Sequence, residues 1–195
     1  MKSKYWLLLA LVLSSCIYRE IHLFNSDDLT WLSPYEQGDT VLFTSECQTD
    51  TMVVTKASLY NSTSIFRKDE GHSVYKANGG FHCSMKHGNQ LIKCRYRFSK
   101  RKEDEIIVYL RVHERYYEEK QKDIHLQKVC YNGKEYDDAI VIDDSNSETK
   151  DYDKLLQNDY FIYSKSKGLL QYKYLNGDVY TFYKIIPRKK RKKYF

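Results

Sequence analysis

Short segments in which apolar and polar residues alternate run through most of this chain, whereas the period of an amphipathic helix is nearly absent. Alternation with a period of two, in segments rich in aromatic and β-branched residues, predicts β-strands. The charged segment 115–123 fits a helical turn or a solvated loop. The predicted fold class is mainly β: antiparallel sheets of hairpins, as a sandwich or an open barrel-like sheet, with little helix outside a signal peptide. The predicted strands cover residues 40–46, 52–59, 73–76, 81–85, 91–96, 105–112, 124–131, 139–142, 160–163, 169–175 and 179–186.

One predicted hairpin has a cysteine on each strand. A two-residue turn at Gly88-Asn89 places Cys83 directly opposite Cys94, at the Cα separation of about 4.5 to 5.5 Å that a disulfide tolerates. Apart from the cysteine at position 16, the chain has four cysteines, and an even number in an exported chain favours two disulfides. We therefore expect the pairs Cys83–Cys94 and Cys47–Cys130, with reduced, buried cysteines as the alternative.

Asn176-Gly177 predicts the last hairpin. Asn-Gly between alternating segments is a strong hairpin signal, because both central residues of a type I′ turn have positive φ. With this two-residue turn, Tyr172 lies on the core face, while Tyr180 and Phe182 lie on the other face. A similar turn is predicted at residues 132–133.

The first sixteen residues have the pattern of a bacterial lipoprotein precursor. Two lysines form a positive n-region, and the apolar segment 5–13 is much shorter than the roughly 20 residues that span a bilayer. Cys16 follows two serines, the position at which such precursors receive their lipid. We therefore predict a signal peptide over residues 1–15 and lipidation (palmitate) of Cys16, with an ordinary secretory signal as the alternative.

The mature chain is long enough for one domain with its own core. We divide it into a lipid-anchored tether (16–36), a single β-rich domain (37–186) and a basic disordered tail (187–195). The formal net charge of +6 depends on the tail and the two leader lysines. The remaining body is slightly acidic, so we expect no basic face suited to nucleic acid. The tail fits a disordered, solubilising end. The alternative is contact with an anionic lipid leaflet, a glycan or an envelope protein through Arg188, Lys189, Lys190, Arg191, Lys192 and Lys193.

Two motifs resemble those of a group of small exported lipoproteins of Bacteroidota. The segment Tyr163-Ser164-Lys165-Ser166-Lys167-Gly168-Leu169-Leu170-Gln171-Tyr172, of the form YSKxxGLLxY, leads into the Asn-Gly hairpin. Gly38-Asp39-Thr40 resembles a strand in the N-terminal half of that group. The resemblance implies a lipid-anchored envelope protein without a defined activity. Because no run of acids follows Cys16, it implies the periplasmic face of the outer membrane rather than the cell surface.

Candidate catalytic chemistry is sparse. His82 and His87 lie near two cysteines in the sequence, but His82 faces away from both, so no metal site is expected. The adjacent acids Asp137-Asp138 and Asp143-Asp144 point apart on strands and are typical of turns. No catalytic or cofactor-binding motif is present in the sequence, so no cofactor is predicted.

We therefore expect a lipid-anchored envelope protein with a binding or structural role, attached to the membrane through Cys16 and without a nucleic-acid partner. Its binding surface is predicted on an exposed aromatic sheet face that carries Tyr180 and Phe182. The alternative is an envelope hydrolase or transferase, which predicts a closed polar pocket with perturbed titratable groups. The oligomeric state is left open.

Overall fold

The computed structural model describes residues 20–61, 74–100, 105–131, 133–149 and 157–188. A parallel pair joins β1 (Glu20–His22) to β4 (Val74–Lys76), and the helical segments are α2 (Ser26–Thr30) and the 3-10 turn η2 (Gln121–Asp123). The other strands are β2 (Thr40–Thr44), β3 (Thr49–Tyr60), β5 (Asn78–His87), β6 (Gln90–Lys100), β7 (Ile106–Val112), β8 (Arg115–Lys120), β9 (Gln127–Tyr131), β10 (Lys134–Ile142), β11 (Glu148–Thr149), β12 (Asn158–Ser164), β13 (Gly168–Tyr174) and β14 (Val179–Ile186).

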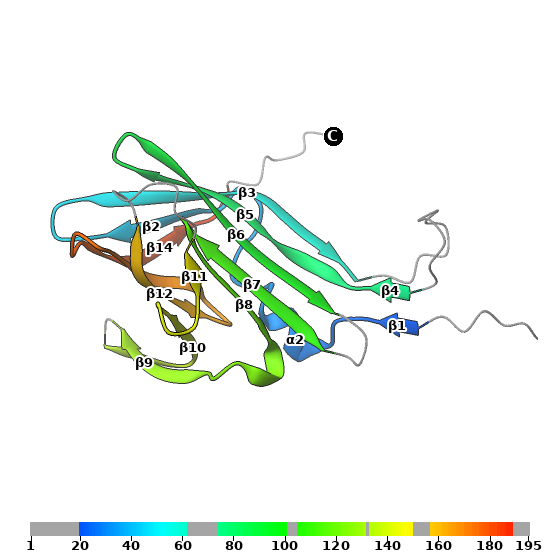
Figure 1. Ribbon diagram of the computed structural model, residues 1–195. Helices are drawn as coiled ribbons and strands as arrows, with labels where there is room; N and C mark the ends of the chain where they lie inside the picture. The colour runs from blue at the N-terminus through cyan, green and yellow to red at the C-terminus, as the bar shows by residue number, and fades with distance from the viewer. Residues whose placement is uncertain (1–19, 62–73, 101–104, 132, 150–156, 189–195) are drawn as a thin grey trace, which may run out of the picture.

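These other strands form one antiparallel sheet of twelve strands that is not closed. Their order in space is β11-β8-β7-β6-β5-β3-β2-β14-β13-β12-β10-β9 (Figure 1). The prediction of a mainly β, antiparallel fold is confirmed.

Alternation along the strands separates a core face from a solvent face. On β6, Ile92, Cys94 and Tyr96 are buried, whereas the residues between them are exposed. Successive side chains of a strand point to opposite faces, so β6 contributes apolar groups inward and charged groups outward. The outer face is therefore free to carry groups that the core does not need.

The sheet curves until its two halves meet across aromatic rings. Trp31 lies between Phe98 on β6 and Tyr163 on β12, with ring centroids 5.5 and 6.3 Å away. Tyr96 lies 5.1 Å from Tyr163, and all four rings are buried. Since β6 and β12 are far apart in strand order, this contact requires the curvature of the sheet.

Much of the segment predicted as a tether, residues 16–36, belongs to the folded domain. Asp28 on α2 forms a buried ion pair with Lys100, at 3.0 Å. The Tyr35 hydroxyl accepts a hydrogen bond of 2.7 Å from the backbone N–H of Leu169. The domain therefore begins earlier than predicted. The widely spaced side chains of Phe24, Trp31 and Tyr35 are buried in the core and anchor a segment whose sequence is mostly polar.

The last hairpin is shifted by one residue from its predicted register. Tyr172 pairs with Tyr180, and the loop has three residues rather than two. The N–H of Gly177 donates to the Tyr174 carbonyl at 2.9 Å, and the N–H of Tyr174 donates to the Asp178 carbonyl at 3.0 Å. Gly177 has a φ of +96°, as expected for a type I turn followed by a bulge. The shift turns Tyr180 into the core, where it is 1% exposed.

The segment predicted as a helical turn or a solvated loop, 115–123, is mostly strand β8. Arg115 is 1% exposed and donates to the Asn158 carbonyl from Nε at 3.0 Å and from Nη2 at 2.8 Å. It also donates to Ser147 Oγ at 2.7 Å, next to β11, which follows β10 in the chain but pairs with β8. Arg115 on β8 thus connects to Asn158 on β12, which lies near the other end of the strand order. The charges of this segment led to the prediction of a turn or loop.

Candidate functional site

A row of basic side chains crosses the outer face of the sheet from β3 to β7. The strand register places Lys56 opposite His82, His82 opposite Arg95, and Arg95 opposite Arg111. We call these four residues the cationic row. Like charges directly opposite one another on neighbouring strands destabilise a sheet. In the row the directly opposed like charges are Arg95 and Arg111, so this pair opposes folding, and a bound anion would relieve its repulsion.

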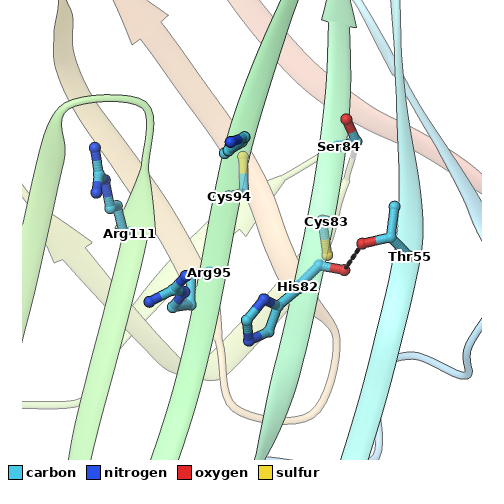
Figure 2. Close-up of a pocket in the computed structure, with 8 residues that line it drawn as sticks. Thr55, His82, Cys83, Ser84, Cys94, Arg95 and Arg111 are labelled. Atoms are coloured by element: carbon cyan, nitrogen blue, oxygen red, sulfur yellow. Dashed lines mark hydrogen bonds between the residues drawn. The ribbon is translucent and has the colours of Figure 1, made fainter.

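A groove of about 410 Å³ lies along the row (Figure 2). Figure 2 shows His82, Arg95 and Arg111 on adjoining strands at this groove. Thr55 Oγ1 donates a hydrogen bond of 2.8 Å to the His82 carbonyl and so ties β3 to β5 beneath it. Ser84 adds a hydroxyl to the lining. Guanidinium and hydroxyl groups in one groove are donors suited to phosphate or carboxylate oxygens.

The neighbouring residues add cations and very few acids. No Asp or Glu occurs in β5, β6 or the turn between them. We define the cationic face as the cationic row together with the exposed side chains of Lys86, Lys93 and Arg97. Within the described part of the chain, no carboxylate pairs with Lys56, Lys93 or Arg95, whereas Glu114 holds Arg111 at 3.0 Å.

The titration of His82 reports this concentration of charge. Partial desolvation lowers the pKa of His82, and the positive charges of Arg95, Lys56 and Arg97 lower it further. The imidazole is therefore held neutral near pH 7. An anion that binds the groove opposes these charges and favours protonation of the ring.

The aromatic surface predicted on β14 is not present. Tyr180 is buried, and Phe182 is only partly exposed and packs against the core. The burial of Tyr180 and the packing of Phe182 both follow from the one-residue shift of the last hairpin. The sheet also carries a basic face that the net charge did not indicate, because net charge averages acids and cations that the register separates. The absence of a nucleic-acid partner stays a prediction.

The four cysteines are free thiols in the structure. Cys83 lies directly opposite Cys94, which confirms the predicted register of the β5–β6 hairpin. Burial raises the pKa of both thiols, that of Cys94 to about 12, so neither is reactive as a thiolate near neutral pH. Cys47 lies between β2 and β3, and Cys130 lies on β9. The two disulfides stay predictions.

A polar cluster occupies the interior where β3, β5 and β13 meet. The Asp50 carboxylate is fully buried and accepts hydrogen bonds from the Tyr172 hydroxyl at 2.6 Å and from Gln48 Nε2 at 3.3 Å. His87 Nδ1 lies 2.8 Å from the same carboxylate. Burial and the Asp50 charge raise the pKa of Tyr172, so its hydroxyl stays protonated. These bonds satisfy the carboxylate and join three strands.

His113 adds a second buried imidazole beside this cluster. Its Nε2 and the Tyr174 hydroxyl are hydrogen-bonded at 2.8 Å. Desolvation, and then the charges of His87 and Arg111, lower the pKa of His113 to about 3. His113 lies in the two-residue turn between β7 and β8, where its backbone has a φ of +56°. A neutral ring at this position is a structural element, and its protonation is costly.

Several predicted site residues lie outside the described residues. These are the signal peptide, Cys16 and positions 189–193 of the basic tail. Arg188 is described, and its N–H lies 3.4 Å from Asp39 Oδ1. Among the described residues, no helix is long and apolar enough to cross a bilayer, and no three His, Cys, Asp or Glu side chains are grouped to hold a metal ion.

Comparison of the chain with protein-family models, with curated proteins and with solved structures gives no match. The functional argument therefore depends on the cationic face and its groove.

We predict that Arg95→Gln raises the pKa of His82, because Arg95 is the positive charge that lowers this pKa most. The pKa is measured by NMR titration of the ring protons. Lys128→Gln, on β9 at the far edge of the sheet, is the control and leaves the titration unchanged. An identical His82 titration in the Arg95→Gln variant contradicts this account of the groove.

We predict that His113 makes the fold sensitive to acid. Its pKa is about 3 in the folded protein and about 6.5 in the unfolded chain, so between these values only the unfolded chain takes up the proton. Stability from this group is complete above pH 6.5 and is lost as the pH falls, by about 2 kcal/mol at pH 5. Urea unfolding at pH 7 and pH 5 measures the loss. His113→Asn removes this part of the pH dependence, whereas His125→Asn, at an exposed position, retains it.

Proposed function

We propose that the protein is a lipid-anchored binding module of the cell envelope that takes an anionic ligand on the cationic face. The cationic row supports this proposal most strongly. Arg95 stands directly between His82 and Arg111, and no carboxylate among the described residues pairs with it. The Arg95–Arg111 pair costs some stability in the free protein, and Arg95 favours a ligand that supplies the missing negative charge.

The arrangement suits phosphate or carboxylate groups held at a surface. Guanidinium groups bind these anions through two parallel hydrogen bonds. Arg95 has no carboxylate partner for its guanidinium among the described residues, whereas Arg111 on the adjoining strand already holds Glu114 (Figure 2). Near an anionic leaflet each basic side chain contributes about 1 kcal/mol. Several cations on one face therefore give useful affinity without a deep pocket.

The anchor brings the domain near a membrane. Only three residues separate Cys16 from β1, which begins at Glu20, so the chain spans at most about 14 Å between them. An acylated Cys16 keeps the β1 end of the domain close to the leaflet that holds the lipid. The anionic headgroups of that leaflet are then the nearest ligand, with an acidic glycan or an acidic envelope protein as further candidates. We place the protein at the periplasmic face of the outer membrane.

The first experiment tests the anchor. The mature protein is expected to begin at Cys16, to carry the mass of its acyl groups and to enter the detergent phase on phase separation. Cys16→Ser is expected to leave the protein in the aqueous phase, because a single sulfur carries the anchor. Mass spectrometry that finds an uncut precursor, or a mature chain with a bare Cys16, contradicts the lipid anchor.

The second experiment tests the cationic face on a protein without leader and anchor, starting at residue 17. We expect binding to vesicles that contain phosphatidylglycerol, weakening with added salt, and no binding to phosphatidylcholine alone. The double variant Arg95→Glu and Arg97→Glu is expected to bind at least about tenfold more weakly, since each lost cation removes about 1 kcal/mol.

The double variant Lys128→Glu and Lys134→Glu is the matched control. It makes the same change in net charge on β9 and β10, at the other edge of the sheet, and is expected to bind as the parent does. The Arg95→Glu variant is also expected to unfold at a higher temperature, because a carboxylate then faces Arg111. Equal loss of binding in both double variants shows an effect of net charge alone and overturns the proposed face.

A further inference from the structure

The end of strand β6 projects beyond its neighbour. β5 pairs with β6 from Gln90 to Ser99, but β7 pairs with it only from Arg95 to Lys100. The same register places Val112, the last residue of β7, beside Cys94, so among the described strands residues 90–93 have a strand partner on one side only. Figure 1 shows the β5–β6 hairpin extending past the β7–β8 turn. This exposed edge has a length of about 14 Å, enough for one short strand beside it.

The direction of the free backbone groups follows from the hairpins. His87 pairs with Gln90 across a two-residue turn, so the peptide groups of Gln90, Ile92 and Cys94 point toward β5. Those of Leu91 and Lys93 then point toward the open side. The β7–β8 hairpin gives the same alternation, because it turns the peptide groups of residue 95 toward β7. Two N–H and two carbonyl groups are thus available for pairing.

A groove of about 420 Å³ runs beside this edge. Its lining includes Ile92, which is 7% exposed, on the inner side of the strand, and the exposed cation Lys93 on the outer side. Arg111, His113 and Glu114 close it at the β7–β8 turn, where Glu114 pairs with Arg111. A strand laid in this groove would meet the apolar side chain of Ile92 inward and the positive charge of Lys93 outward.

We propose that this edge takes an extended acidic segment of another polypeptide as an added antiparallel strand. Main-chain hydrogen bonds to Leu91 and Lys93 supply the pairing, and alternate side chains supply the choice of partner. The partner carries a carboxylate at the outward position opposite Lys93 and an apolar residue at the inward position beside Ile92. The site is distinct from the lipid-binding role proposed above, although both use the positive charge of β6.

Charge argues against a second copy of the same edge as the occupant. Self-pairing would bring two β6 strands together, and the β5–β6 hairpin contains no acid but four exposed cations: Lys86, Lys93, Arg95 and Arg97. Exposed lysines at sheet edges hinder association between identical copies. The same charges attract an acidic strand, so the edge discriminates between partners by the sign of their charge.

The probe is a blocked octapeptide that alternates Glu with Val, added to the protein without leader and anchor. In an antiparallel pair the residues opposite Leu91 and Lys93 are the outward Glu residues, and their N–H groups point at β6. N-methylation of the Glu residues is therefore expected to raise the Kd at least about tenfold. N-methylation of the Val residues, whose N–H groups point away, leaves the Kd unchanged. Equal binding of the two methylated peptides overturns the proposal.

Two measurements on the protein complete the test. Bound peptide is expected to slow hydrogen exchange at the Leu91 and Lys93 amides, which are otherwise open to solvent. Leu91→Pro removes one of these donors without touching the β5 side and is expected to weaken peptide binding, whereas Leu91→Ala retains it. Vesicle binding is unaffected by Leu91→Pro, which separates this edge from the cationic face. Unprotected amides in the presence of bound peptide, or sedimentation showing a β6-mediated dimer, overturn the proposal.

Discussion

Contact between two halves of one curved sheet, through the rings of Trp31, Phe98 and Tyr163, is the interaction on which the rest of the structure depends. Aromatic pairs at these separations contribute about 0.5 to 1.5 kcal/mol each beyond the burial of their area. Trp31 belongs to the N-terminal segment and not to the sheet, so that segment fills the space that curvature creates. An open sheet can therefore bury its inner face without closing into a barrel.

Because the inner face provides the packing, the outer face is free to carry charge at a modest cost. A like-charged cross-strand pair destabilises by a fraction of a kcal/mol, and a domain of this size has about 5 to 15 kcal/mol of stability. The interior bears a different electrostatic cost, because His113 and Asp50 sit where water does not reach. Desolvation keeps His113 neutral, and hydrogen bonds satisfy the carboxylate of Asp50. Charges without such partners, such as that of Arg95, lie instead on the outer face of the sheet, beside a groove.

Much of the fold was predictable, and the failures have local physical causes. Alternation gave the strands and the Gly88-Asn89 turn gave the β5–β6 register, since a glycine at the first turn position suits a two-residue loop. Asn176-Gly177 suits more than one loop, and the side chain of Asn176 bonds to the backbone N–H of Asp178 at 3.0 Å, in the longer one. β8 was missed because Arg115 is buried by partners from distant segments, which no local pattern contains.

The candidate site shows where sequence reasoning stops. The predicted β5–β6 register already places His82 opposite Arg95, so half of the cationic row could have been found from the sequence. Lys56 and Arg111 join the row only because β3 and β7 flank that hairpin, and strand order depends on contacts across the whole core. A bulge between Val54 and Lys56 also changes which β3 side chain faces His82. Net charge, which ignores all of this, pointed away from a basic surface. The alignment of four basic residues is thus a property of the tertiary fold, and it exists only while the aromatic core keeps these strands in register.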